Sequence, residues 1–187
     1  MDIREHSVAL ISVIVGLGLT VLLANLNRLI RARREVHWDV LPLLWALIAL
    51  LLVNNYWWGL YQGSVVATAA SSAATFLVGL SMPIMLYLIC AAALPKLRST
   101  GGGDMRAEYL AESRYFFALI LLYVLATMAQ TLVAMGTFRW SEAMVQRCLL
   151  MAVIAPLIWK RSIGYHWFAT GTMLLILVYR LMQQELH

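Results

Sequence analysis

The chain has 187 residues, of which 63% are hydrophobic and 12% are charged, and its formal net charge is +5. Soluble domains carry about 25% charged residues, so this composition excludes an ordinary soluble protein and is typical of an integral membrane protein. The net positive charge does not indicate nucleic-acid binding, because the basic residues lie where apolar segments end, as in membrane proteins.

The first two apolar segments predict a membrane hairpin. Residues 8–27 and 40–63 contain no charged residue, and about 20 apolar residues cross a bilayer as a helix because lipid cannot satisfy backbone polar groups. Asp39 is expected to cap the second helix. The turn between the two segments is basic, so we expect it to stay in the cytoplasm and contact anionic lipid headgroups or a protein partner. Its basic residues are Arg28, Arg31, Arg33 and Arg34.

Aromatic residues flank the second helix at both ends, which is typical of the two membrane–water interfaces. They are Trp38 and Trp45 at one end and Tyr56, Trp57, Trp58 and Tyr61 at the other.

The rest of the chain predicts four more membrane helices, which gives an all-α integral membrane protein with a single six-helix transmembrane domain over residues 1–187. The third helix is long, and Pro83 is expected to kink it. Residues 95–114 are predicted to form a cytoplasmic loop, in which Asp104 caps a short helix at the membrane surface. The predicted helices cover residues 7–29, 40–60, 65–94, 115–136, 141–159 and 163–182.

The basic residues also predict the orientation. Ten of the 14 lysines and arginines fall in the predicted cytoplasmic turns or at adjoining helix ends. The remaining four are Arg4, Arg139, Arg147 and Arg180. By the positive-inside rule both termini face outside. The compact chain shows no organelle signal, so we expect a bacterial inner membrane with both termini in the periplasm.

Two runs of small residues predict close helix packing. Gly16, Thr20 and Ala24 lie four residues apart on one stripe of the first helix. Ser71 and Ser72 belong to a small-residue run in the third helix. Small side chains let helix backbones approach closely in lipid, so we expect these faces to support a homo-oligomer.

Arg147 is the most informative single residue, because a cation inside a membrane helix is costly. It can be an arginine that snorkels to the interface, half of a buried ion pair, or part of an anion or substrate site. Glu142 is five residues earlier, which is an imperfect helical spacing for a direct pair. The candidate polar path or ligand site consists of Arg147, Glu142, Asn25, Asn54, Asn55, Ser71, Ser72 and Gln130.

No motif indicates an enzyme, a metal site or a cofactor. The phosphate-loop, HExxH and membrane serine-protease patterns are not found. His6, His37, His166 and His187 fall in predicted turns, tails or helix ends, so we expect them to be solvated or interfacial and not to bind haem.

Two functions from different classes remain. The first is an oligomeric ion channel or small-solute transporter with a polar path between the helices. The alternative is a non-transporting membrane anchor, sensor or subunit that engages lipid or a protein through the basic cytoplasmic turns. The apolar centres of the second, fourth and sixth helices argue against a wide pore.

Overall fold

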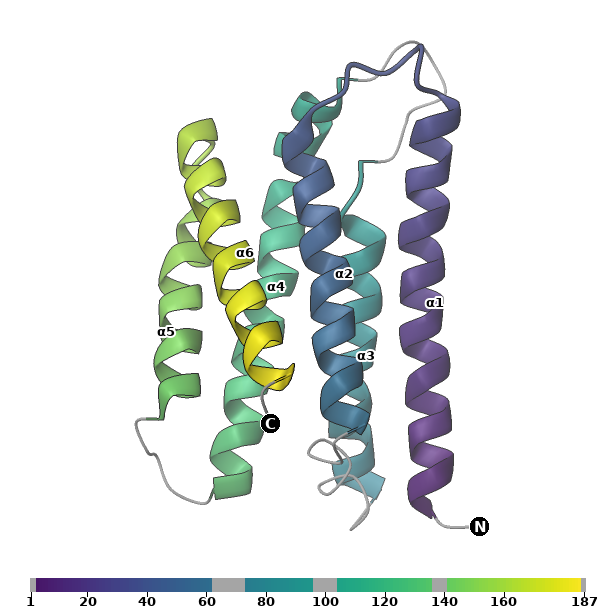
Figure 1. Cartoon of the computed structure of the whole chain (residues 1–187), viewed down its shortest axis with the longest axis vertical. Helices are drawn as coiled ribbons and strands as arrows, with labels where there is room; N and C mark the ends of the chain where they lie inside the picture. Colours follow the sequence, from purple (N-terminus) through teal and green to yellow (C-terminus); the bar gives the residue numbers. More distant parts are fainter. Residues whose placement is uncertain (1–2, 62–72, 96–103, 136–140, 186–187) are drawn as a thin grey trace.

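The computed structural model describes residues 3–61, 73–95, 104–135 and 141–185. This part of the chain is built from helices, which confirms the all-α prediction (Figure 1). The helices are α1 (Ile3–Arg31), α2 (Val40–Tyr61), α3 (Ala73–Ala92), α4 (Met105–Met135), α5 (Glu142–Ile154), the 3-10 helix η2 (Ala155–Ile158) and α6 (Ile163–Glu185).

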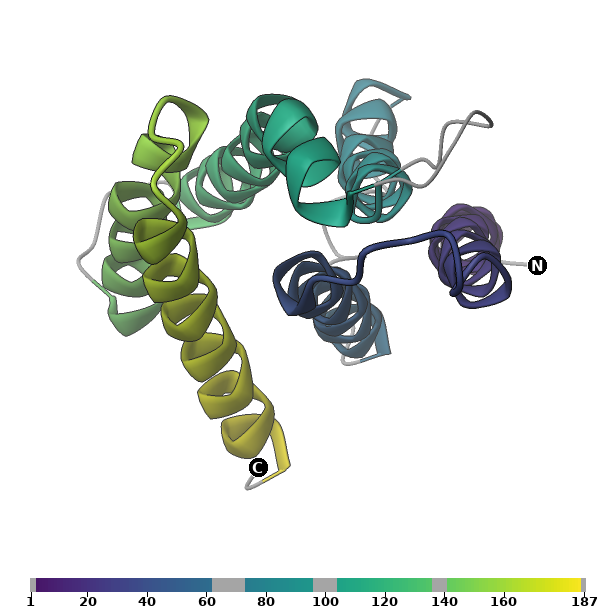
Figure 2. The ribbon, with the colours of Figure 1, turned by 90° about the horizontal axis from the view of Figure 1, so that it is seen from above.

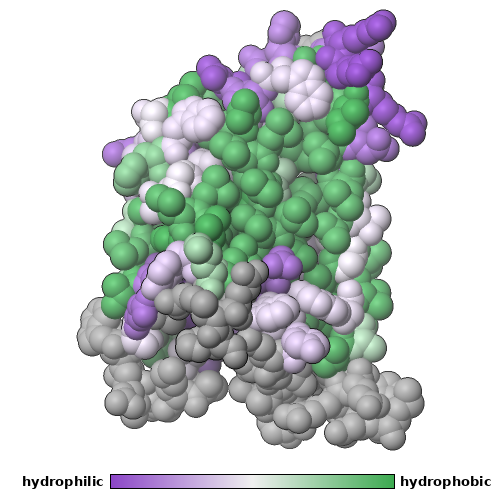
Figure 3. Space-filling view, viewed as in Figure 1, coloured by the Kyte–Doolittle hydropathy of each residue, from purple (hydrophilic) through white to green (hydrophobic). Residues whose placement is uncertain are grey.

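Three helical stretches of the described residues are long and apolar enough to cross a membrane. They are Val8–Arg31, Val40–Tyr61 and Met105–Leu132. Figure 3 shows the matching surface, with hydrophobic side chains across the middle and hydrophilic ones gathered at the end where the α1–α2 turn lies. Large apolar side chains that face outward, such as Leu17, Leu122 and Leu175, fit a lipid environment. Two shorter apolar helical stretches cover Gly79–Ala92 and Met144–Ile158.

The helices divide into a pair and a ring. α1 packs mainly against α3, and this pair lies beside α2 and α4 (Figure 2). α2 contacts α4 and α6, and α5 also contacts α4 and α6. α2, α4, α5 and α6 therefore form a four-helix ring.

The start of α4 corrects the predicted cytoplasmic loop over residues 95–114. The helix begins at Met105, and Met105 and Tyr109, four residues apart, are both buried. This spacing turns one helix face toward the bundle instead of leaving the segment on the membrane surface. Asp104 caps the helix as predicted, since the Arg106 N–H donates to its Oδ1 at 2.9 Å. The predicted surface helix is thus the beginning of a 31-residue helix.

Two other helices bear on the predictions. Pro83 lies inside α3, and its kink remains a prediction. Residues 62–72, and with them Ser71 and Ser72, lie outside the described residues.

α5 ends at Ile154, before its predicted end, and η2 follows it. Pro156 explains this change, because a proline has no N–H to continue the α-helical pattern and a tighter turn takes its place.

The close approach between α1 and α3 occurs at Gly18. A Cβ atom on Gly18 would lie 3.1 Å from the Cα of Tyr87 on α3, whereas a Cβ on Gly16 would meet nothing within 4 Å. Gly16, Thr20 and Ala24 are exposed. The predicted small-residue stripe thus faces away from the chain's own bundle, and its packing against a second copy remains a prediction.

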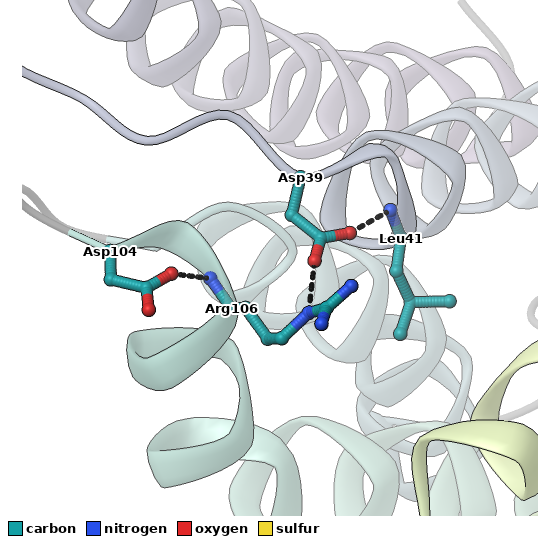
Figure 4. Close-up of polar contacts among 4 residues, drawn as sticks. All are labelled: Asp39, Leu41, Asp104 and Arg106. Atoms are coloured by element: carbon teal, nitrogen blue, oxygen red, sulfur yellow. Dashed lines mark hydrogen bonds and ion pairs between the residues drawn. The ribbon is translucent and has the colours of Figure 1, made fainter.

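Asp39 joins the α1–α2 turn to the start of α4 (Figure 4). The Leu41 N–H donates to Asp39 Oδ1 at 2.9 Å, which confirms the predicted cap, and Oδ2 pairs with the Arg106 guanidinium. Beside this pair, the Met105 N–H donates to the His37 carbonyl at 3.3 Å. These contacts fix the basic turn against α4. The exposed arginines of the turn and the adjoining end of α1 are Arg28, Arg31, Arg33 and Arg34.

Candidate functional site

Arg147 is half-buried on α5 and donates a hydrogen bond from Nη1 to the Thr131 hydroxyl on α4. Thr131 gives its own proton to the Thr127 carbonyl at 2.9 Å, which leaves its oxygen lone pairs for Arg147. This contact places the guanidinium between α4 and α5, but a hydroxyl does not neutralise its charge.

A second arginine lies nearby on α6. Arg180 is half-buried, and its Nε donates to Gln146 Oε1 on α5 at 3.2 Å. Gln146 Nε2 in turn donates to Glu142 Oε1 at 3.4 Å, and the Tyr179 hydroxyl donates to the same oxygen at 3.2 Å. Glu142 therefore takes hydrogen bonds from two neutral groups at the exposed rim of the network.

Arg147 and Arg180 are close enough for their charges to repel each other. The buried side chain of Tyr123, on α4, lies within electrostatic range of both. Within the described residues, the ion pair found is that of Arg106 with Asp39. Neither arginine of this site is therefore neutralised by a described carboxylate.

Tyr56 extends the site to α2. The side chain is only 6% exposed, and its hydroxyl has no hydrogen-bond partner among the described residues. It lies within electrostatic range of Tyr123. The sequence predicted an interfacial aromatic residue here, and the structure adds that Tyr56 is buried within the bundle. A buried hydroxyl without a partner costs about 1–3 kcal/mol, so it calls for a bound water, ion or ligand as its explanation.

Three of these side chains lie at a similar depth, whereas Thr131, 26 residues from the first residue of α4, lies further from the basic end. Tyr56, Tyr123 and Arg180 are 16, 18 and 17 residues from the first residues of α2, α4 and α6. At about 1.5 Å per residue, each lies roughly 25 Å from the basic end of the bundle. We call this set of side chains the arginine cluster. Its members are Tyr56, Tyr123, Thr131, Gln146, Arg147 and Arg180.

The other half of the four-helix ring is filled by aromatic side chains. Trp45 lies edge-on to Phe117 and Phe116, with centroids 4.9 and 5.6 Å apart. Tyr109 and His166 also stack edge-on, with centroids 5.5 Å apart. All five are buried, including Trp45, which the sequence placed at the interface. We call these five residues the aromatic cluster, and they leave the inside of this half without charge.

His166 corrects the prediction that the histidines are solvated or interfacial, because it is fully buried. Its Nε2 faces the Lys160 carbonyl at 3.1 Å and its Nδ1 faces the Tyr109 hydroxyl at 2.8 Å. A carbonyl only accepts, so Nε2 carries the proton. In the neutral imidazole, Nδ1 then accepts from Tyr109, and both ring nitrogens are satisfied.

Some of the predicted site residues meet at the arginine cluster. Arg147 belongs to it, and Glu142 joins it through Gln146. Asn55 is half-buried next to Tyr56, and its Nδ2 lacks a described partner. The remaining two predicted residues at this end of the ring are the exposed Asn54 and the half-buried Gln130.

The arginine cluster and the predicted site residues differ at other positions. Asn25 lies on α1, outside the four-helix ring. Arg180 was noted only as a charge on the outer side, and the contribution of Tyr123 was missed. A usable signal existed for Arg180, since apolar residues flank it within a predicted membrane helix, as they flank Arg147.

Comparison of the chain with models of protein families, with curated proteins and with solved structures gave no match. Over the described residues, no group of three or more His, Cys, Asp or Glu side chains is placed to hold a metal ion. The candidate site is the arginine cluster, in which Tyr123 lies within electrostatic range of Arg147 and Arg180, and Tyr56 lies within range of Tyr123.

Proposed function

We propose that the protein is a six-span membrane transporter for a small solute, and that the arginine cluster binds this solute. The observation that carries the proposal is the pair of half-buried arginines, Arg147 and Arg180, without a described carboxylate partner. Charged side chains inside membrane helices are costly and commonly mark a substrate or ion pathway. Mutual repulsion adds to this cost, and a bound solute would offset both.

A transporter fits the interior of the chain better than a permanently open channel. An open pore needs a polar path through both halves of the four-helix ring, whereas the aromatic cluster fills one half with buried rings, including Trp45 and Phe117. Solute bound at the arginine cluster would cross only after the helices around the aromatic cluster move apart. This is the behaviour of alternating access.

The proposal includes an orientation. The basic end, with Arg33 and Arg34, faces the cytoplasm of a bacterial inner membrane and contacts anionic lipid headgroups. α1 begins, and α6 ends, toward the opposite end of the bundle (Figure 1), so the arginine cluster faces the periplasmic side. A homo-oligomer would cover the exposed stripe at Gly16.

The test is solute uptake into liposomes that contain the purified protein. Uptake should be saturable, and it should fall strongly for Arg147→Gln and for Arg180→Gln. Arg161→Gln is the matched control, because Arg161 is exposed at the basic end and should leave uptake unchanged. Absence of uptake above protein-free liposomes for a panel of small ions and solutes would reject transport.

The exposed arginines beside the Asp39–Arg106 pair favour a second candidate function. They present a basic surface at one end of the bundle, which suits a membrane anchor or sensor that engages anionic lipid. Native mass spectrometry of the purified protein tests this function. Anionic lipid should be retained, and it should be lost in the variant with Arg33→Gln and Arg34→Gln, whereas Arg161→Gln should retain most of it.

A further inference from the structure

We propose that the solute bound at the arginine cluster is a small oxyanion, a carboxylate or a phosphate, held between Arg147, Arg180, Tyr123 and Tyr56. This inference rests on the proposed function, because it names the substrate class of the same site. The choice of an anion follows from the cluster's many hydrogen-bond donors and few acceptors.

The cluster supplies many donors and few acceptors. A guanidinium only donates hydrogen bonds. In the described contacts, Arg147 donates from Nη1 to Thr131, and Arg180 donates from Nε to Gln146. The acceptor oxygens of Thr131 and Gln146 are therefore already engaged. The nearest carboxylate of the network, that of Glu142, lies at its exposed rim. A cation would find only neutral hydroxyl oxygens beside two positive charges, whereas an anion would satisfy the remaining N–H groups of the arginines.

Tyr56 points to a ligand independently of the arginines. Its side chain is 6% exposed, and its hydroxyl is buried without a described partner. The neighbouring buried side chains of α2, those of Leu52, Val53 and Leu60, offer only carbon. A bound anion near Tyr123 would give this hydroxyl the acceptor that the described residues do not provide.

An oxyanion fits this arrangement better than a halide. Each guanidinium is a planar fork that matches the two oxygens of a carboxylate or phosphate. Arg147 and Arg180 come from different helices and are held in place by separate contacts, with Thr131 and Gln146. Two forks on two sides can engage several oxygens of one anion, whereas a single halide offers no such geometry.

A free oxyanion and a lipid phosphate share this chemistry, so the source must be decided. The cluster lies roughly 25 Å from the basic end, near the far side of a hydrocarbon layer about 30 Å thick. However, Tyr56 and Tyr123 are only 6% and 8% exposed, and they lie on α2 and α4, inside the four-helix ring. A lipid headgroup would reach the outer surface of the arginines and not these two hydroxyls. The structure therefore favours a free solute.

The experiment is calorimetric titration of the full chain in dodecyl maltoside, a detergent without phosphate or carboxylate. The probes are sodium phosphate, sodium acetate and sodium chloride at matched ionic strength, and dihexanoyl phosphatidic acid as a soluble lipid analogue. Saturable binding of phosphate or acetate, stronger than that of chloride, is expected. Absence of such binding, equal binding of chloride, or binding of the lipid analogue alone would overturn the proposal.

Two tyrosine variants locate the site. Tyr56→Phe should weaken oxyanion binding about tenfold, since it removes one hydrogen bond to a charged ligand. Its melting temperature should not fall, because the lost hydroxyl had no described partner. Tyr61→Phe, on the same helix and 80% exposed, should bind as the wild type does. Equal affinity of Tyr56→Phe and wild type would overturn the assignment of this site.

Binding and flux measured on the same preparations separate this inference from the proposed function. Flux without oxyanion binding would overturn the inference and leave transport of another solute in place. Oxyanion binding that Tyr56→Phe weakens, without flux, would support the site and reject transport.

Discussion

The Tyr109 hydroxyl lies 2.8 Å from Nδ1 of His166 and joins α4 to α6 in the buried interior near the basic end. His166 also donates through Nε2 to the Lys160 carbonyl, which ties the turn before α6 to the bundle. At this end of the four-helix ring both imidazole nitrogens have partners. At the other end, Tyr56 has none among the described residues, and two arginines repel each other. The imidazole of His166 is thus satisfied, whereas buried polar atoms without a described partner occur in both halves of the ring, namely Trp45 Nε1 in the aromatic cluster and the Tyr56 hydroxyl and Asn55 Nδ2 at the other end.

Tyr109→Phe should destabilise the protein by about 1–3 kcal/mol, because Nδ1 of His166 would remain buried without a donor. The measurement is the midpoint of thermal unfolding in detergent. Tyr115→Phe is the control, since Tyr115 is on the same helix and 55% exposed, and it should unfold as the wild type does. Equal midpoints for the two variants would show that the Tyr109–His166 bond adds no stability.

Asp39 has two roles, which different substitutions separate. Asp39→Asn keeps a side-chain oxygen that can cap Leu41 and loses only the charge opposite Arg106, so it should cost less than about 1 kcal/mol. Asp39→Ala loses both contacts and should cost about 1–2 kcal/mol. Arg106→Gln should resemble Asp39→Asn, because the arginine side chain is 50% exposed. Thermal unfolding of the three variants checks this order. Equal losses of stability for Asp39→Asn and Asp39→Ala would show that the cap on Leu41 adds no stability.

Much of the fold could be predicted because lipid restricts what an apolar segment can do. The observed bounds of α2, Val40–Tyr61, differ from the prediction by one residue at its end. The continuity of the predicted short helix with the rest of α4 was missed, because charged residues such as Arg106 and Glu108 are typical of a surface segment. The spacing of Met105 and Tyr109 was a helical signal in the same segment, but their burial depends on partner helices that the sequence does not name.

The site was less predictable than the fold, because it depends on which helices are neighbours. Arg147 could be singled out from its apolar surroundings alone. Its neighbours Thr131, on α4, and Arg180, on α6, are 16 and 33 residues away in the chain. Tyr56 has the sequence context of an interfacial aromatic residue, and only the packing of α2 against α4 and α6 shows that it is buried.

Gly18 and Gly16 should respond differently to the same substitution. Gly18→Leu should destabilise the protein, because even a Cβ atom would lie 3.1 Å from the Tyr87 backbone on α3. Gly16→Leu has open space within the chain and should leave the melting temperature unchanged. If the stripe of Gly16, Thr20 and Ala24 packs against a second copy, Gly16→Leu should lower the oligomer mass measured by light scattering. An unchanged oligomer mass would show that this stripe is not an interface between copies.

Cysteine labelling tests the proposed orientation. In a background with Cys90 and Cys148 replaced by alanine, Glu35→Cys and Ser162→Cys are exposed at the basic end. A membrane-impermeant maleimide should label them only after the cell membrane is opened. Tyr61→Cys, at the other end of α2, should be labelled in intact spheroplasts. Labelling of Glu35→Cys from outside would reverse the orientation.

Arg147→Gln separates the possible roles of the arginine. If Arg147 were half of a buried ion pair, this change would orphan a carboxylate and destabilise the protein by about 3–5 kcal/mol. The described contacts predict otherwise. Glutamine can still donate to the Thr131 hydroxyl, and the substitution removes the repulsion from Arg180. The melting temperature should therefore equal or exceed that of the wild type.

Oxyanion uptake by the same preparations should show the opposite trend. Arg147→Gln should lose most of the uptake, because it removes one of the two cations that hold the anion. Arg147→Lys should retain part of it, since lysine keeps the charge but lacks the planar fork. Arg161→Gln, exposed at the basic end, should match the wild type in both assays. A large loss of stability in Arg147→Gln would indicate a carboxylate partner, such as one from a second copy. Wild-type uptake in both Arg147 variants would leave the residue as an interface anchor, because a solute site between the two arginines cannot lose one of them without effect.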